Sequence, residues 1–460
     1  MMNPFKDNFT WGAAASSYQI EGAWREDGKG ASIWDMIAHQ PGRIHENGNG
    51  DVACDHYHRY REDVALMKEI GLKAYRLSVS WPRVMPTGRG PVNEAGLAFY
   101  DRLVDELLAQ GIDPWVTLFH WDLPYDLFLR GGWLNPDSPE WMAEYSAAVV
   151  ERLSDRVTHW ITINEPQCMI GLGYLKANCT HAPNMEVGMR EALLAAHHVL
   201  MAHGRSVQAI RAHAKKTPVI GLSLVGYASS PLTESPEDIE AARNATHSVE
   251  GGHFWNHSWW GDPVVFGHYP EVGLKSYAKD LPEFKSSDFD TIRQPVDFMG
   301  MNVYWGGHTK AGADGGCQAV PSPKGQPLTH FNWPISPEIL YWAPKFYAEH
   351  YKLPVVITEN GLSSCDAIAL DGRVHDTGRI DFLHRYLLAM RRAVADGVDI
   401  RGYFHWSIMD NFEWAEGYKH RFGLIHVDYE TQKRTLKDSA YWYRDVIRSN
   451  GACLALPQQS

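Results

Sequence analysis

The chain has 460 residues, with 43 Lys and Arg against 55 Asp and Glu and a formal net charge of −12. An acidic surface repels phosphate backbones and anionic lipids, so neither nucleic acid nor a membrane is expected as a partner. The length suits either two or three average domains or a single barrel with long loops.

Six cysteines are scattered along the chain without Cys-x-x-Cys spacing. This pattern favours free thiols in a reducing cytoplasm over a disulfide framework. The first residues, Met1–Lys6, contain no apolar stretch of the kind found in a secretory signal. No apolar run reaches the length of about 18 residues needed to cross a bilayer. We therefore expect a cytoplasmic protein.

A short apolar strand, a loop and an amphipathic helix recur along the chain. Strands are expected at Phe9–Ala14, Lys73–Val79, Asp113–Phe119, His159–Ile163, Val219–Leu224, Asp297–Asn302, Val355–Thr358 and Ile400–His405. Helices are expected at Tyr60–Ile70, Glu94–Gln110, Pro139–Leu153, Glu191–Ala214 and Ile380–Ala395. This alternation predicts an α/β fold, a closed (β/α)8 TIM barrel. Because no low-complexity linker interrupts it, residues 1–460 are expected to form a single domain.

The loops that follow the strands must hold much of the chain, because a bare barrel needs only roughly 250 residues. The longest turn-rich stretch is Val303–Pro337, which is dense in Gly and Pro. Other long loops follow the third, fourth and eighth expected strands. These loops occupy the face on which barrel enzymes bind their ligands, so we expect them to form the walls of a deep pocket.

Two glutamates stand where expected strands turn into loops. Glu165 lies between Asn164 and Pro166, and Glu359 lies in Thr358-Glu359-Asn360-Gly361. Two carboxyl groups from different strands are the minimum equipment for cleaving a glycosidic bond. One must keep its proton as a general acid and the other must be ionised as a nucleophile. Arg76, in the middle of another expected strand, could hold Glu359 charged.

Further polar and aromatic side chains lie at or just past the ends of the expected strands: Gln19, His120, Asn302, Tyr304, Trp406, Glu413 and Trp414. Amides, imidazole and carboxylate suit the recognition of hydroxyl groups, and indoles suit stacking on a ring. Neither His56 with His58 nor His197 with His198 has zinc-ligand spacing. Walker, strand-linked G-x-G-x-x-G and G-x-S-x-G motifs are absent. Neither a metal nor a cofactor is expected.

Several long motifs together resemble glycoside hydrolase family 1, the family of retaining β-glucosidases. The resemblance runs from about Phe9 to about Tyr443. It rests on the segments Phe9–Gly22, Ala53–Tyr57, Tyr75–Trp81, His120–Pro124, Thr162–Pro166, Thr358–Gly361, Trp406-Ser407, Asp410–Trp414 and Arg421–Leu424. The resemblance implies a (β/α)8 barrel with one catalytic glutamate after the fourth strand and the other after the seventh.

The resemblance also implies a role for each candidate residue. Glu165 would be the acid/base and Glu359 the nucleophile. The residues that bind the hydroxyl groups of a terminal glucose would be Gln19, His120, Asn164, Glu413 and Trp414. Trp406 would form a platform under the sugar ring, and Phe422 would also contact the substrate. Asn302 and Tyr304 would lie beside the nucleophile, and Arg76 would lie behind it. The substrate would be a small β-glucoside or disaccharide, cleaved with retention and without a cofactor.

Some features leave alternatives open. Gln167 stands where many members of the family carry Trp, at a position expected to border the leaving group. A 6-phospho-β-glycosidase would typically have Ser and a nearby Lys in place of Glu413. A thioglucosidase would have Gln in place of Glu165, and a non-catalytic sugar-binding protein would have lost one of the two glutamates. A transglycosidase would use the same residues as a hydrolase.

Overall fold

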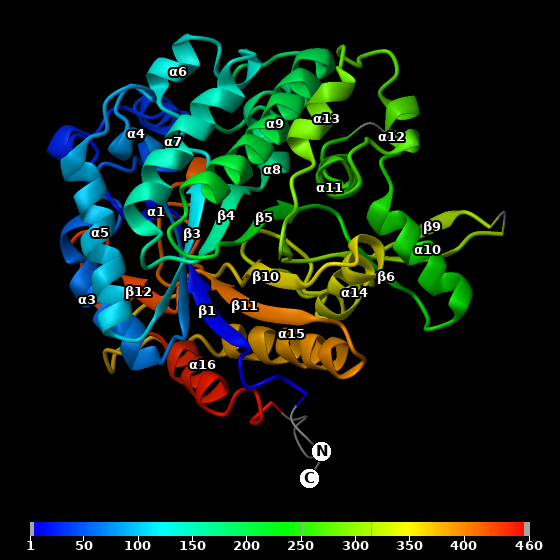
Figure 1. Ribbon diagram of the computed structural model, residues 1–460. Helices are drawn as coiled ribbons and strands as arrows, with labels where there is room; N and C mark the ends of the chain where they lie inside the picture. Colours follow the sequence, from blue (N-terminus) through cyan, green and yellow to red (C-terminus); the bar gives the residue numbers. More distant parts are fainter. Residues whose placement is uncertain (1–3, 251–252, 314, 455–460) are drawn as a thin grey trace.

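The computed structural model describes residues 4–250, 253–313 and 315–454. Eight parallel strands close into a barrel in the order β1-β11-β10-β7-β5-β4-β3-β2. They are β1 (Thr10–Ala14), β2 (Ala74–Ser78), β3 (Asp113–Phe119), β4 (His159–Asn164), β5 (Val219–Val225), β7 (Phe298–Asn302), β10 (Val355–Asn360) and β11 (Ile400–Trp406). Figure 1 shows β1 beside β11, the contact that closes the barrel. The predicted fold is confirmed.

Helices surround the barrel, as Figure 1 shows. The longer ones are α3 (His56–Ile70), α5 (Glu94–Ala109), α7 (Ser138–Leu153), α9 (Met189–His213), α10 (Pro236–His247), α14 (Ile339–Tyr351), α15 (Thr377–Ala395) and α16 (Asp438–Arg448). The shorter ones are α1 (Ser17–Ile20), α2 (Ile33–Ala38), α4 (Trp81–Val84), α6 (Tyr125–Leu129), α8 (Pro166–Gly173), α11 (Ser258–Val265), α12 (Glu271–Ser276) and α13 (Ser286–Ile292). Because side chains fill the barrel on one face and helices cover the other, the strands are almost wholly buried.

The eight predicted strands are all present, and their observed ends lie within two residues of the predicted ones. The largest difference is at β10, which was expected to stop at Thr358 but continues to Asn360. Its register shifts between Ile357 and Glu359 against β7, and again before Asn360 against β11. Glu359 therefore lies within an irregular strand end and not in the following loop, where the surrounding strands restrict its movement.

Part of the stretch Val303–Pro337 is more regular than expected. It contains β8 (Gly307–Ala311) and β9 (Cys317–Val320), which pair antiparallel, and β8 also pairs with β6 (Ser229–Pro231). A second small sheet, β12 (Ile425–Val427) with β13 (Arg434–Leu436), follows the last barrel strand. These additions brace the loops above the barrel. In the described part of the chain, no helix is long and apolar enough to cross a membrane.

The ends of β10 and β11 approach each other closely at Gly361. A methyl group at this position would stand 1.8 Å from the carbonyl oxygen of Trp406. We expect Gly361→Ala to lower the free energy of unfolding by about 1–3 kcal/mol, as overpacking does, in urea denaturation. The matched control is Gly378→Ala in α15, where nothing lies within 4 Å and Ala should stabilise the helix by about 0.5–1 kcal/mol. Similar losses in both variants would contradict this expectation.

Candidate active site

A cavity of about 920 Å³ lies at the carboxyl ends of the barrel strands. Nine of the residues predicted from the sequence line it: His120, Glu165, Asn302, Tyr304, Glu359, Trp406, Glu413, Trp414 and Phe422. Four others do not line it and lie behind its wall: Gln19, Arg76, Asn164 and Gln167. The folded chain therefore brings residues from the ends of five barrel strands, or from the loops after them, to one cavity, as the strand ends suggested.

Glu359 is held by two hydrogen bonds, one to each carboxylate oxygen. Arg76 Nη1 donates to Oε1 at 2.7 Å, and the Tyr304 hydroxyl donates to Oε2 at 2.6 Å. Burial raises the pKa of Glu359, while the positive charge of Arg76 and the Tyr304 hydroxyl act against burial by favouring the ionised form. This environment suits a carboxylate that reacts in its charged form.

The environment of Glu165 favours the ionised form less than the environment of Glu359 does. Its Oε1 accepts a hydrogen bond from Asn302 Nδ2 at 2.7 Å. Burial, followed by the nearby charge of Glu359, raises the pKa of Glu165 to about 8. At neutral pH this carboxyl group therefore keeps its proton, as a general acid must. The two glutamates are chemically identical but are placed in environments that separate their protonation states.

The backbone is strained at three residues of the cavity wall. Trp121, Glu165 and Trp414 have φ values of 78°, 42° and 49°, in the left-handed region that non-glycine residues rarely adopt. Such conformations cost on the order of 1 kcal/mol or more and persist where the surrounding structure enforces them. At Glu165 the turn comes directly before Pro166, which begins α8 and fixes the direction of the chain. The strain therefore coincides with the residues that face the cavity.

Asn164 determines which nitrogen of His120 carries a proton. Asn164 Oδ1 accepts hydrogen bonds from Arg76 Nη2 at 2.5 Å and Asn302 Nδ2 at 3.1 Å, which fixes the orientation of its amide. Its Nδ2 must then donate to His120 Nε2, at 3.1 Å. Burial, and secondarily the charge of Arg76, lowers the pKa of His120 well below its ordinary value. The neutral ring therefore carries its proton on Nδ1.

Glu413 is positioned by Gln19 from behind the wall. Gln19 Nε2 donates to Glu413 Oε2 at 3.3 Å and to the Phe412 carbonyl at 2.9 Å. Among the described residues, no Lys, Arg or His forms an ion pair with Glu413. Burial, followed by the charges of Glu359 and Glu165, raises the pKa of Glu413 to about 8. A ligand that donates hydrogen bonds would satisfy this carboxyl group.

Aromatic rings form much of the remaining wall. The rings of His120 and Trp406 are nearly parallel, with centroids 5.7 Å apart. Trp333 lies against Tyr304 with a centroid distance of 5.3 Å. The sequence analysis missed several aromatic residues of the wall: Tyr227, Trp255, Trp305, Phe331 and Trp333. Tyr227 and Trp305 lie just past the ends of β5 and β7, the same signal that indicated Tyr304. The other three lie on loops far from the end of any barrel strand. Only the high Trp content hinted at them.

The prediction that Gln167 faces the leaving group is wrong. Its side chain is fully buried; Oε1 accepts from the Val225 amide and Nε2 donates to the Asn256 carbonyl, both at 3.4 Å. Helix α8 starts at Pro166, so successive side chains turn by about 100°. This rotation directs Gln167 away from the cavity, whereas Cys168 lines it. The start of a helix at Pro166 could have indicated this from the sequence.

Within the described residues, no group of three or more His, Cys, Asp or Glu is placed to hold a metal ion. The chemistry that the cavity offers is that of its carboxyl groups. The carboxyl group of Glu165, whose pKa is raised to about 8, and that of Glu359, hydrogen-bonded to Arg76, face the same space beside hydroxyl-binding groups and flat rings. Such a site can protonate one side of a bond while a nucleophile attacks the other.

Comparisons with known proteins agree with this chemistry. β-Glucosidase A of Thermotoga maritima is 44% identical over 451 residues, which are 97% of this chain and 98% of that protein. A solved structure of β-glucosidase from Thermotoga maritima in complex with glucoimidazole is 44% identical, with a TM-score of 0.89, and the match covers 98% of this chain and 100% of that one. An aryl-phospho-β-D-glucosidase of Bacillus subtilis is 39% identical over 482 residues, with 98% of each chain covered. Residues 1–452 match the model of glycosyl hydrolase family 1, and the chain belongs to this family.

Proposed function

We propose that the protein is a retaining β-glucosidase, which releases terminal β-D-glucosyl residues from oligosaccharides and from aryl or alkyl glucosides. The observation that carries the proposal is the unequal environment of the two glutamates in one cavity. Arg76 and Tyr304 favour the charge of Glu359, while burial keeps the proton on Glu165. The similarity to enzymes named β-glucosidase supports the same activity.

The reaction then proceeds by two displacements. The Glu359 carboxylate attacks the anomeric carbon while Glu165 gives its proton to the leaving oxygen, and a glycosyl-enzyme forms with inverted configuration. Glu165, now ionised, takes a proton from water, and the resulting attack releases the sugar with a second inversion. Neither step requires a cofactor. Before the attack, Tyr304 and Arg76 hold Glu359 in place through their hydrogen bonds.

The terminal glucose would be recognised by three kinds of group. The carboxyl group of Glu413 accepts hydrogen bonds from sugar hydroxyls, and the Nδ1 proton of His120 donates one. Trp406 stacks on the apolar face of the ring. Gln19 and Asn164 contribute by orienting Glu413 and His120, to which they are hydrogen-bonded.

A 6-phospho-β-glycoside is a poorer candidate substrate, although a similar enzyme of Bacillus subtilis carries a phospho-glucosidase name. Arg43 is the one Lys or Arg among the described residues that line the cavity, and it lies exposed on the surface. Near Glu413 a phosphate would meet a carboxyl group that forms no ion pair with a Lys, Arg or His among the described residues.

The proposal includes the setting in which the protein works. Residues 1–460 would act as one catalytic domain on a small-molecule substrate such as cellobiose, within cellulose breakdown. The cytoplasm is the proposed location, supported by the free thiols of Cys54, Cys168 and Cys179.

A mechanism-based inhibitor tests the proposed function directly. A 2-deoxy-2-fluoro-β-glucoside with a good leaving group should inactivate the enzyme by forming a covalent bond with Glu359. Peptide mapping by mass spectrometry should locate the label, and NMR should show a β-configured first product from an ordinary β-glucoside. A label on another residue, or an α-configured first product, would refute the assignment.

The pH dependence tests the role of Glu165. Because its proton is needed, kcat/KM should fall as the pH rises through about 8, the value to which burial raises the pKa of Glu165. On a 4-nitrophenyl glucoside, whose leaving group benefits from a proton but can still depart without one, Glu165→Ala should keep measurable activity and lose this alkaline limb. Glu413 has a pKa near the same value, about 8, so Glu413→Gln is the control and should retain the limb. An unchanged limb in Glu165→Ala would assign it to another group.

Substrate charge distinguishes the proposed activity from the phospho-glycosidase alternative. We expect kcat/KM for 4-nitrophenyl β-glucoside to exceed that for its 6-phosphorylated form by at least about 100-fold, because the phosphate would lie near the carboxyl group of Glu413, which has no cationic partner in the described part of the chain. Initial rates on the two substrates, with the same enzyme preparation, provide the measurement. Preference for the phosphorylated form would overturn the prediction.

A further inference from the structure

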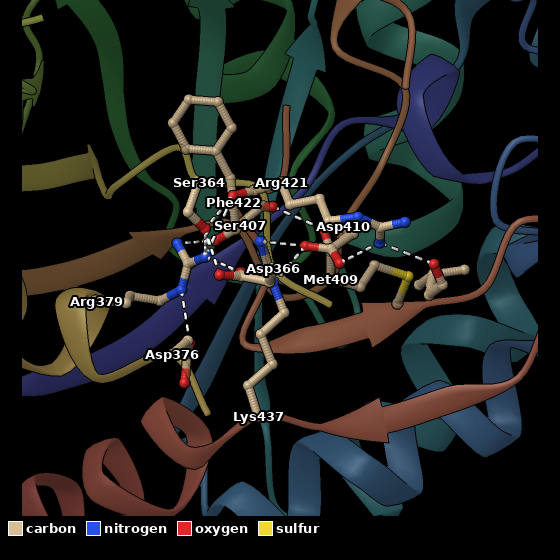
Figure 2. Close-up of polar contacts among 12 residues, drawn as sticks. Ser364, Asp366, Asp376, Arg379, Ser407, Met409, Asp410, Arg421, Phe422 and Lys437 are labelled. Atoms are coloured by element: carbon tan, nitrogen blue, oxygen red, sulfur yellow. Dashed lines mark hydrogen bonds and ion pairs between the residues drawn. The ribbon is translucent and has the colours of Figure 1, made fainter. Parts of the chain in front are cut away.

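A buried network of charges lies outside the cavity, next to the loops that follow β10 and β11 (Figure 2). It contains equal numbers of acids and bases: Asp366, Asp376 and Asp410 with Arg379, Arg421 and Lys437. The side chains of Arg379, Lys437 and Asp410 are completely inaccessible to solvent. None of the six residues lines the cavity, so the proposed reaction does not use them. We call these six residues the ion network.

One pair in the ion network joins the two ends of a loop. Arg421 Nη1 donates to Asp410 Oδ2 at 2.6 Å, and Lys437 Nζ donates to Asp410 Oδ1 at 2.7 Å. Between Asp410 and Arg421 runs the segment 411–420, which we call the recognition loop. It carries four residues that line the cavity: Glu413, Trp414, Ala415 and Glu416. The pair therefore closes the base of the loop that presents Glu413.

The same end of the recognition loop is attached to the loop that follows β10. The backbones of Arg421 and Ser364 exchange two hydrogen bonds of 3.0 Å each. Arg379 Nη2 donates to the carbonyl of Arg421 at 3.2 Å and to Ser364 Oγ at 2.7 Å. Burial alone would raise the pKa of the nearby Asp366, yet the charges of Arg379 and Lys437 hold it well below its usual value. The attachment is thus made by fully paired, buried charges.

The recognition loop is held along its length as well as at its base. Its one regular element is the short helix η5 (Trp414–Glu416), and the side chains of Phe412 and Trp414 are buried. The Phe412 amide donates to the Gln19 carbonyl, and Gln19 Nε2 donates to the Phe412 carbonyl and, at 3.3 Å, to Glu413. Closing a loop at its base reduces its conformational freedom before a ligand binds. The position of Glu413 therefore depends on Gln19 and on how the ends of the loop are held.

We propose that the Asp410–Arg421 ion pair is a specificity-determining contact, which positions the recognition loop so that Glu413 selects sugars with a 6-hydroxyl group. This inference rests on the proposed function, in which Glu413 binds sugar hydroxyls. Asp410 and Arg421 touch no substrate; they act through Glu413 as positioning residues. When the pair is broken, the loop still folds back over the barrel but Glu413 no longer stays in one place.

The experiment compares two substrates in three enzymes. The substrates are 4-nitrophenyl β-D-glucoside and 4-nitrophenyl β-D-xyloside, which lacks the hydroxymethyl group. The enzymes are the unaltered protein, Arg421→Met and the control Arg156→Met, which breaks the half-buried pair of Arg156 with Asp101 among the outer helices, away from the recognition loop. The ratio of the two kcat/KM values does not depend on how much of each preparation is active. General loss of stability therefore leaves this ratio unchanged.

We expect the glucoside-to-xyloside ratio to fall at least about five-fold in Arg421→Met, roughly the factor of one hydrogen bond. It should stay within about two-fold of the unaltered value in Arg156→Met. Arg421→Lys, which keeps the charge, should restore most of the ratio. An unchanged ratio in Arg421→Met would overturn the inference, as would an equal fall in Arg156→Met.

A second variant covers the case in which Arg421→Met does not fold. The double change Asp410→Asn with Lys437→Met removes one negative and one positive charge, so the ion network stays neutral. It should give the same fall in the ratio, and an unaltered ratio would refute the inference. If the unaltered protein hydrolyses no β-glucoside at all, the proposed function fails, and this outcome is distinct from failure of the positioning role.

Discussion

The active cavity depends on a single buried cation, Arg76. It extends from β2 and is about 1% exposed. Its guanidinium group donates to Thr117 on β3, to Asn164 on β4 and to Glu359 on β10. A buried charge that lacks a partner is strongly destabilising. The fold therefore requires a negative charge opposite Arg76, and Glu359 provides it, so the stability of the barrel and the ionisation of the proposed nucleophile rest on one ion pair.

The contacts of Arg76 also explain why Glu165 and Glu359 differ in how readily they ionise. Arg76 contacts Glu359 directly, whereas Glu165 is hydrogen-bonded to the neutral amide of Asn302. The charge stabilised on Glu359 then acts on Glu165, where it adds to the effect of burial in raising the pKa. One fixed cation is enough to make two carboxyl groups of the same cavity unequal. Asn302 connects Glu165 to Arg76, because its amide donates to Glu165 and to the oxygen of Asn164 that also accepts from Arg76.

The sequence predicted the features that follow from regular structure. Strand ends are visible in it because buried strands are continuous apolar runs bounded by Pro or Gly, and Glu165 and Glu359 mark two of them. Gln167 was misplaced because the direction of a side chain depends on where α8 begins. The sequence did not predict the ion network, because Asp366, Asp410 and Lys437, each taken alone, are residues typical of a protein surface. Only folding shows that these charges are buried together.

Strand ends and loops contribute different functional residues to the walls of the cavity. The carboxyl groups proposed to react lie at or next to strand ends, where the barrel restricts movement, while Glu413 lies on a loop held by Gln19 and at its base. Loops vary with little cost to a barrel, so recognition can change while the reacting pair stays in place. Here the loop is fixed by buried charges whose sum is zero. Such a set tolerates paired changes better than single ones, because removing one charge leaves another unpaired in the interior.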